Sequence, residues 1–302
     1  MMKATVSREE HRLPGREAEI ATLGRAIDAA ERAQGSVWLI TGEAGVGKSR
    51  LVEESCAEAA ARGFATLWGR CWEAGGAPPY WPWIQVLRAL SRVRAAGLLE
   101  LFRARAPFIE PWLPELRGAL GGPSISEPPE PETARFRLFD AIASLLCDAG
   151  QQLPLCIVLE DLHAADASSL QLLSLLSDQS RTARVLTLAT TRSLDGMPAQ
   201  SAEILRRTAR GARRLELGRF GPEAVRDVLA RELGRDVSQA VVQAALRTSE
   251  GNALFLMELV RFLAVRGEAG LLDRQLGFVP DTLRTAIGER LGELSVDARS
   301  VL

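Results

Sequence analysis

Residues 42–49 read GEAGVGKS, and they lie between an apolar run at 37–40 and an Ala- and Glu-rich segment at 49–62. The stretch fits G-x-x-x-x-G-K-[ST], a loop that follows a buried strand and opens a helix. Its glycines let the backbone curl until successive N–H groups face phosphate oxygens, and the helix N-terminus also favours an anion. The sequence therefore predicts a strand, a phosphate-binding loop and a helix, in that order.

The residue types of this loop assign the expected contacts. Lys48 should reach the β- and γ-phosphates of a nucleotide, and the Ser49 hydroxyl should bind Mg²⁺. The expected nucleotide contacts are Gly42, Glu43, Ala44, Gly45, Val46, Gly47, Lys48, Ser49 and Arg50. The alternative is a glycine turn with a solvated lysine, which the flanking strand and helix disfavour.

The run LCIVLED, residues 155–161, ends in two carboxylates. Continuous apolar runs are typical of strands buried on both faces of a parallel sheet. A carboxylate at the tip of such a strand can hold the water shell of Mg²⁺, and a second one can orient or deprotonate the attacking water. Glu160 and Asp161 are therefore candidate catalytic residues, with Glu160 and Ser49 as the metal ligands, and the identity of the base stays open. Acidic residues also end strands by chance, so this interpretation depends on the loop upstream.

Arg192 directly follows VLTLATT, residues 185–191. It should lie at the carboxyl edge of the sheet, where ligands bind in open α/β folds. There its guanidinium can contact the γ-phosphate, which makes it a candidate catalytic residue together with Lys48. The alternative is a surface arginine in a chain whose 37 basic residues are nearly all arginine.

Apolar runs alternate with helical patterns as far as about Leu217, which predicts right-handed βαβ units and a doubly wound parallel α/β sheet. The expected strands are 37–40, 64–68, 155–159, 185–189 and 213–217. After Gly218 the pattern is helical. We expect three parts: a P-loop nucleotide-binding domain at 1–218, a helical lid domain at 219–276 and the beginning of a winged-helix segment at 277–302.

The composition of the chain excludes several classes of protein and of function. The 302 residues carry 37 Lys and Arg against 38 Asp and Glu, and 47% are hydrophobic, which excludes a disordered, collagen-like or coiled-coil chain. The net charge of -1 argues against strong nucleic-acid binding, which needs a positive excess. Four cysteines without a C-x-x-C pair, and two histidines, predict reduced core thiols rather than a metal cluster. No apolar run approaches the ~18 residues of a membrane span, so we expect a cytoplasmic protein.

With its motifs in this order, the chain resembles signal-transduction ATPases with numerous domains (STAND), AAA-like P-loop proteins with an Orc1-like ATPase domain found at the N-terminus of large LuxR-type transcriptional regulators. LPGREAEI resembles the family's opening segment, which implies that Gly15, Arg16 and Glu17 lie near the adenine. GEAGVGKS resembles its Walker A loop, and LCIVLEDLHAAD resembles its Walker B strand with the following turn. ATTR resembles the sensor strand, which implies that Arg192 senses the γ-phosphate.

EGNALFLMEL, residues 250–259, resembles the lid-helix motif that closes over the nucleotide, and the segment from Val279 resembles the opening of a winged helix. Three positions depart from the family pattern. Glu160 stands in place of Asp, which implies slow or lost hydrolysis. Ala164 replaces Trp and Ala253 replaces Pro, which affects the adenine contact and the rigidity of the lid. Because the chain stops within the winged-helix segment, we expect a fragment, a truncated product or a stand-alone switch module.

The resemblance implies an ATP-binding, slowly hydrolysing regulatory switch that is closed with ADP, open with ATP and self-associating in the ATP state. It implies Mg²⁺ as cofactor, no membrane partner and no strong nucleic-acid binding by this segment. Three alternatives stay open. A DNA-associated AAA+ ATPase of the initiator or clamp-loader kind would show DNA-stimulated turnover, and a scaffold would hold ATP without cleaving it. A small-molecule kinase would build its acceptor site from one aromatic loop, containing Trp72, Tyr80, Trp81 and Trp83.

Overall fold

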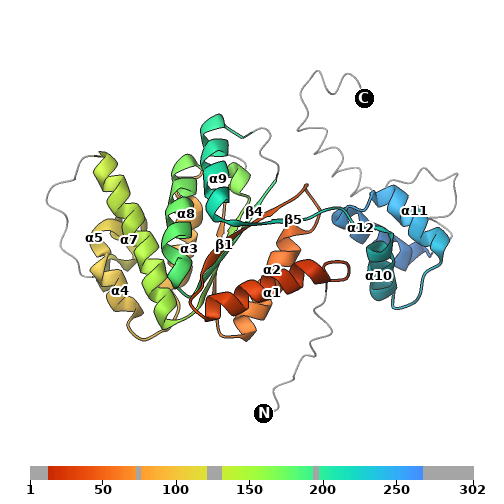
Figure 1. The fold of residues 1–302 in the computed structure, drawn as a ribbon, viewed down its shortest axis with the longest axis horizontal. Coiled ribbons are helices and arrows are strands. Elements are labelled where there is room, and N and C mark those ends of the chain that lie inside the picture. The colour runs from red at the N-terminus through yellow and green to blue at the C-terminus, as the bar shows by residue number, and fades with distance from the viewer. Residues whose placement is uncertain (1–12, 73–75, 121–130, 193–196, 268–302) are drawn as a thin grey trace, which may run out of the picture. The chain divides into compact units, whose positions relative to one another are not determined.

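The computed structural model describes residues 13–72, 76–120, 131–192 and 197–267. They form two compact units, which Figure 1 shows. The sheet unit consists of Ala18–Glu43 and Lys48–Leu217. The helical unit consists of the described residues within Met1–Glu17, Ala44–Gly47 and Gly218–Leu302. The winged-helix segment expected at 277–302 lies outside the described residues.

The sheet unit is built on five parallel strands in the order β2-β3-β4-β1-β5, which confirms the predicted doubly wound α/β fold. The strands are β1 (Ser36–Thr41), β2 (Ala65–Arg70), β3 (Leu155–Glu160), β4 (Val185–Thr191) and β5 (Arg213–Glu216). Every residue of β3 and β4 is buried, as expected for apolar runs covered on both faces. Parallel pairing brings the carboxyl ends to one edge, where Arg70 lies opposite Glu160.

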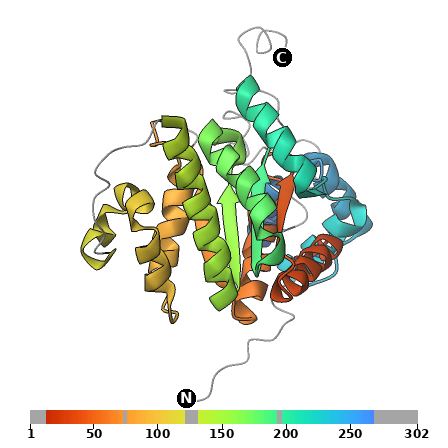
Figure 2. The same cartoon turned by 60° about the vertical axis from the view of Figure 1, so that its left-hand side comes forward.

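Helices cover both faces of this sheet. On one face α7 (Pro131–Gln152), α8 (Ala167–Gln179) and α9 (Ala199–Gly211) lie side by side, as Figure 2 shows, and α3 (Trp81–Ser91) packs beside β2. On the other face lie α1 (Glu17–Glu31) and α2 (Lys48–Ala61), and α2 is the helix predicted after the glycine loop. The loop at 42–47 therefore connects β1, which lies between β4 and β5, to a helix on one face.

α9 is not predicted from the sequence, because its apolar stripe is short. Ala202, Leu205 and Thr208 are its main buried positions, and the rest of the helix is largely polar. The spacing of three residues is helical, but two small or polar side chains among the three give a weak hydrophobic signal.

The aromatic residues do not share one loop, which corrects the prediction. Trp81 and Trp83 form the first turn of α3, and Tyr80 precedes that helix. Trp83 is fully buried, and its indole Nε1 donates to the carbonyl of Ser169, 3.0 Å away. Trp72 is 58% exposed. A tryptophan that packs in the core cannot form the acceptor pocket that the kinase alternative needs.

The four cysteines are free. Cys56 on α2 and Cys156 on β3 meet in the core, with their sulfur atoms 3.8 Å apart. Burial raises the pKa of Cys147 to about 11. Burial, followed by the charges of nearby carboxylates, raises the pKa of Cys71 to about 12. At neutral pH these two thiols therefore stay protonated.

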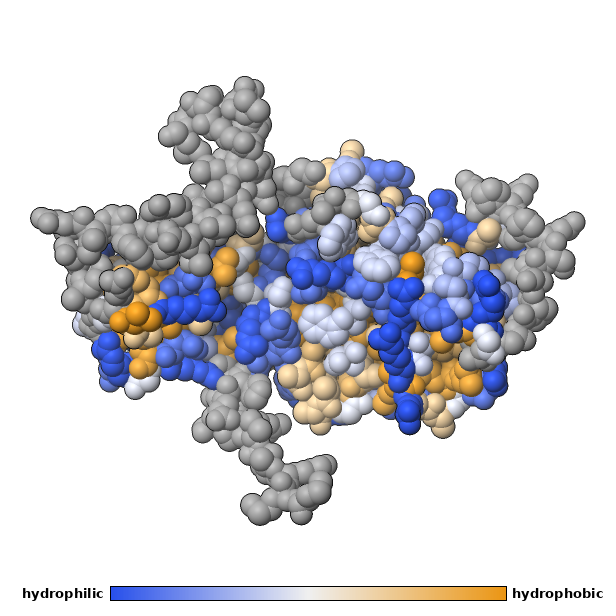
Figure 3. Space-filling model, turned by 180° about the vertical axis from the view of Figure 1, so that it is seen from behind, coloured by the Kyte–Doolittle hydropathy of each residue, from blue (hydrophilic) through white to orange (hydrophobic). Residues whose placement is uncertain are grey.

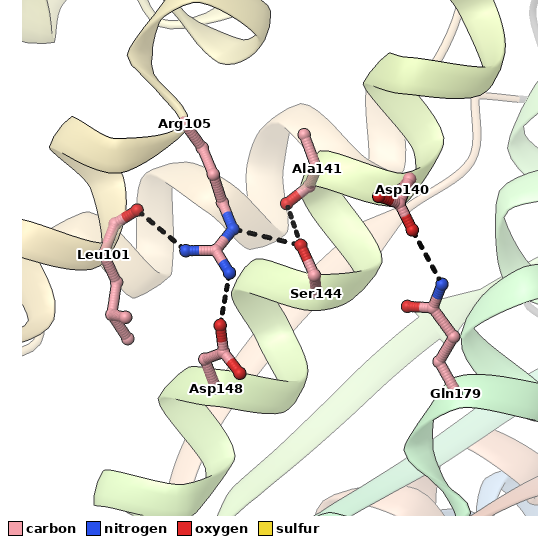
Figure 4. Close-up of polar contacts among 7 residues, drawn as sticks. All are labelled: Leu101, Arg105, Asp140, Ala141, Ser144, Asp148 and Gln179. Carbon is pink, nitrogen blue, oxygen red and sulfur yellow. Dashed lines mark hydrogen bonds and ion pairs between the residues drawn. The ribbon is translucent and has the colours of Figure 1, made fainter.

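An insert between β2 and β3 packs against α7. It contains α4 (Leu98–Ala104), α5 (Ala106–Ile109) and α6 (Arg117–Leu120). Arg105 joins the insert to α7, as Figure 4 shows. Its guanidinium donates to the Ser144 hydroxyl (3.0 Å), to the Leu101 carbonyl (3.2 Å) and to the Asp148 carboxylate. One side chain therefore holds both elements.

Replacing Arg105 with alanine should lower the free energy of unfolding by about 1–2 kcal/mol, because three hydrogen bonds of a largely buried cation are lost. Urea denaturation followed by circular dichroism measures this change. Arg181→Ala is the matched control, since its ion pair with Asp178 is exposed and should contribute under about 0.5 kcal/mol. Equal urea midpoints of unfolding for the two variants would contradict the role of Arg105 in joining the insert to α7.

The helical unit contains α10 (Pro222–Leu233), α11 (Gln239–Ser249) and α12 (Ala253–Arg266) around a core of its own. Its buried residues recur at helical spacing: Val225, Val228, Leu229, Val241, Val242, Ala245, Leu256, Leu259, Val260 and Leu263. Side chains cap two of these helices. The Ser238 hydroxyl accepts from the Val241 amide at the start of α11, and the Asn252 side chain caps α12.

The large hydrophobic side chains that are exposed within the described residues are spread along the chain, and only Leu254 and Val265 share an element, α12: Trp72, Leu99, Phe136, Leu254 and Val265. On the face in Figure 3, hydrophilic residues lie among the hydrophobic ones. None of the helices in the described ranges has the length and apolar character needed to cross a bilayer.

Candidate phosphate-binding site

The loop at 42–47 joins the end of β1 to the start of α2, as predicted. Three of its glycines adopt backbone angles that other residues rarely take, with φ of 151° at Gly42, 76° at Gly45 and 103° at Gly47. At Gly45 a side chain is also excluded by space, because a Cβ would lie 2.8 Å from an oxygen of Asn252. The curled loop therefore requires its glycines.

Lys48 is 8% exposed, and its ammonium donates to the carbonyls of Gly42 (2.8 Å) and Glu43 (2.9 Å). Burial lowers the pKa of Lys48, the charge of Arg192 lowers it further, and the carboxylate of Asp161 opposes this shift. Lys48 begins α2 after the loop from β1, whereas Asp161 and Arg192 directly follow β3 and β4. Because β3, β4 and β1 are neighbours in a parallel sheet, the structure places these three predicted catalytic residues at one edge of the sheet.

The two carboxylates after β3 have different surroundings. Asp161 takes φ 60°, donates its amide to the Thr190 hydroxyl (3.1 Å) and accepts a hydrogen bond from Arg70 Nε (3.1 Å). The Glu160 side chain is 9% exposed, and its carboxylate has no hydrogen-bond or ion-pair partner among the residues that the structure describes. Asp161 is therefore occupied by an arginine, whereas Glu160 is available to a cation.

These oxygens fit Mg²⁺. Magnesium in nucleotide sites takes one or two protein oxygens and completes its shell with phosphate oxygens and water. Ser49 is exposed in the first turn of α2, and Glu160 has a carboxylate to offer. Within the described ranges, no group of three or more His, Cys, Asp or Glu residues forms a metal cage. The donor set therefore suits a cation that arrives with a nucleotide.

Other predicted contact residues are placed differently. Arg50 forms ion pairs along α2, at 3.2 Å to Glu53 and 4.0 Å to Glu54. Gly15 donates its amide to the Glu17 carboxylate (3.1 Å), which closes the turn before α1.

Arg16, predicted near the adenine, is 6% exposed and contacts the loop itself. Its Nη2 donates to the carbonyls of Val46 (3.1 Å) and Gly218 (2.6 Å). The guanidinium also lies over the Phe220 ring, 4.4 Å from its centroid. Arg16 therefore supports the backbone of the phosphate-binding loop.

Three residues at or near the loop and the carboxylates were missed by sequence reasoning. Arg70 pairs with Asp161, and Asn252 contacts the loop. Asp166 caps α8 and also accepts a hydrogen bond from the Tyr80 amide (3.1 Å). This bond connects the residue before α3 to the turn after β3. Asp166 and Asn252 leave a local signal, because Asp or Asn before a helical pattern is typical of an N-cap, whereas Arg70 leaves none.

Two solved structures share the fold. The ADP form of ORC2 from Aeropyrum pernix is 15% identical with a TM-score of 0.54, and the match covers 97% of this chain and 73% of that one. A replication initiator DnaA bound to AMPPCP and single-stranded DNA is 12% identical with a TM-score of 0.50, and the match covers 90% of this chain and 69% of that one. At these identities the likeness shows the fold alone.

Comparison of the sequence with known proteins identifies the family of this chain. An uncharacterised protein of Rhizobium meliloti (strain 1021) is 30% identical over 171 residues, which are 53% of this chain. The match spans only 16% of the length of that relative. The family model of the AAA ATPase domain matches residues 12–188, which is more than half of the chain and includes the loop, both carboxylates and the first strands of the sheet. The chain therefore belongs to the AAA ATPase domain family, whose members carry an AAA-like P-loop nucleotide-binding module.

Proposed function

We propose that this AAA ATPase domain binds ATP and ADP with Mg²⁺ and acts as a slowly hydrolysing switch, closed with ADP and open with ATP, in a bacterial signalling or transcriptional regulator. The observation that carries the proposal is the curled glycine loop with the buried Lys48 after it, at the sheet edge where Asp161 and Arg192 follow the neighbouring strands β3 and β4. Support for the regulatory setting comes from the resemblance of the motifs to the STAND proteins.

Lys48 and Arg192 give the site a reason to bind ATP and ADP with different affinity. Arg192 lies near enough to Lys48 to lower the pKa of its ammonium, so the two positive charges repel each other. A γ-phosphate that contacts both groups relieves this repulsion, and ADP has none. A ligand shifts a conformational equilibrium only through such differential binding.

The carboxylates explain why turnover should be slow. Asp161 is engaged by Arg70 and is therefore held away from the task of a general base. Glu160 stands where the resemblance implies an aspartate, and its extra methylene moves the carboxylate relative to the metal. A switch needs hydrolysis only to reset, so low turnover suits this function.

Replacing Arg70 with alanine should raise the rate of ATP hydrolysis about two- to fivefold. The ion pair is partly exposed, with 68% of the Arg70 side chain accessible, so it is worth about 0.5–1 kcal/mol, and its loss frees Asp161 to that extent. Steady-state phosphate release measures the change. Arg207→Ala, which removes an exposed ion pair with Glu203 on α9, is the control and should leave the rate unchanged. A lower rate in Arg70→Ala would show that the pair supports hydrolysis.

The remaining parts of the chain complete the proposal. We propose that the helices within residues 219–267 act as the lid of the nucleotide site, as the resemblance of EGNALFLMEL implies. Gly15, Arg16 and Glu17 lie on the adenine side of the nucleotide. In the ATP state the open form self-associates, which light scattering on the Mg–ATP and Mg–ADP complexes tests directly.

Denaturing the purified protein and identifying the nucleotide that it releases tests the proposed function. Bound ADP is the expected result for a resting switch. Protein that releases nothing and binds neither ATP nor ADP in calorimetry would overturn the proposal. Turnover that rises on addition of single-stranded DNA would favour the initiator-like alternative.

A further inference from the structure

Three consecutive carbonyl groups of the loop, residues 44–46, each accept a hydrogen bond from another segment of the helical unit. The Asn252 side-chain amide donates to the first (3.0 Å) and the backbone amide of Leu254 to the second (2.9 Å). Arg16 Nη2 donates to the third (3.1 Å). The loop tip and its three donors belong to the same compact unit.

These contacts fix the direction of the amide groups. In a trans peptide the C=O and the following N–H point in opposite directions. Holding the carbonyls of residues 44–46 therefore turns the N–H groups of Gly45, Val46 and Gly47 away from the three donors. Donors aligned before a ligand arrives bind it more tightly, because their ordering is already complete.

Asn252 has two separate tasks in this arrangement. Its Oδ1 accepts from the amides of Leu254 (3.1 Å) and Phe255 (3.5 Å), which caps α12. Its Nδ2 faces the other way and donates to the carbonyl of Ala44. The side chain is 2% exposed, so water cannot replace either contact.

We propose that Asn252 is a positioning residue for nucleotide binding, whose Nδ2 orients the phosphate-binding amides of the loop. The inference rests on the proposed function and names a residue that couples the helical unit to the loop. Because coupling free energies are reciprocal, a nucleotide that tightens the loop also tightens the hold of α12 on it.

Two substitutions separate the tasks of Asn252. Asn252→Asp and Asn252→Ser both keep an oxygen that caps α12, and both lose the amide donor to Ala44. The serine variant adds no charge, so it excludes electrostatic repulsion of phosphate as the cause of an effect. Ser238→Ala is the matched control, because it removes the cap of α11 in the same unit without touching the loop.

Both Asn252 variants should bind ADP about five- to tenfold more weakly than the parent in calorimetry, as expected for the loss of one buried hydrogen bond to the loop. Ser238→Ala should lower the melting temperature and leave ADP binding unchanged. Parental affinity in both Asn252 variants, or an equal loss of affinity in Ser238→Ala, would overturn the inference.

Hydrogen exchange tests the same inference without a nucleotide. In the free protein, the peptide that covers residues 42–49 should exchange faster in both Asn252 variants than in the parent and in Ser238→Ala. Unchanged exchange would overturn the inference whether or not the protein binds nucleotide. A parent that binds neither ATP nor ADP would overturn the proposed function, and the exchange comparison would still decide whether Asn252 holds the loop.

Discussion

Replacing Lys48 with methionine should weaken ATP and ADP binding by about 100-fold, and the purified variant should release no nucleotide on denaturation. The ammonium is buried against the loop, where a charged hydrogen bond to phosphate is worth about 1.5–3 kcal/mol. Methionine keeps the apolar stem and removes the charge together with the hydrogen bonds to Gly42 and Glu43, so the packing of α2 should survive.

The measurement for Lys48 is calorimetric titration with each nucleotide, alongside a melting curve of the free protein. A melting temperature close to that of the parent shows that lost binding is not lost folding. The effect should be larger for ATP than for ADP, because the proposed γ-phosphate contact is also lost. Equal losses for both nucleotides would contradict the role of Lys48 and Arg192 in telling them apart.

Replacing Glu160 with glutamine should lower the rate of ATP hydrolysis at least about 100-fold while nucleotide affinity stays within about threefold. Glu160 is the carboxylate free to hold a metal, and a metal or base contribution to phosphoryl transfer is of this order. Glutamine has the same shape, so it should not disturb the end of β3.

Single-turnover phosphate release measures the loss at Glu160, and calorimetry measures the retained affinity. Glu203→Gln, on the exposed surface of α9, is the control and should hydrolyse like the parent. Glu160→Asp should raise turnover if the longer side chain is what slows the reaction. If Glu160→Gln hydrolyses at the parental rate, Asp161 is the working carboxylate, and Asp161→Asn should then abolish turnover.

The fold and the centre of the site are predictable because their signals are local. GEAGVGKS carries its own glycines and lysine, and the buried runs that form β3 and β4 end at the carboxyl edge of the sheet. Arg192 follows the same logic, because its place is set by the end of its strand.

Residues that act across the fold are not predictable in this way. Arg70 reaches Asp161 because the register of β2 on β3 places Arg70 opposite Glu160. The register of two parallel strands cannot be predicted from the sequence of either strand alone. Asn252 meets Ala44 across 208 positions of sequence, and its motif resembles a lid helix without indicating which backbone atom the amide contacts. Trp83 is predicted in a loop from its proline-rich surroundings, whereas the structure places it in the first turn of α3.

Residues 44–47 belong to the helical unit, although they lie between β1 and α2 in the sequence. This assignment limits where the chain can be cut without losing contacts to the loop. A chain cut after Leu217 keeps the whole GEAGVGKS motif and all five strands, and any motif search would count it as intact. Yet such a truncated chain lacks the amides of Asn252 and Leu254, which donate to the Ala44 and Gly45 carbonyls of the loop. A cut after Leu217 thus separates the loop from residues that hold it. We therefore expect that a minimal nucleotide-binding fragment must extend through α12.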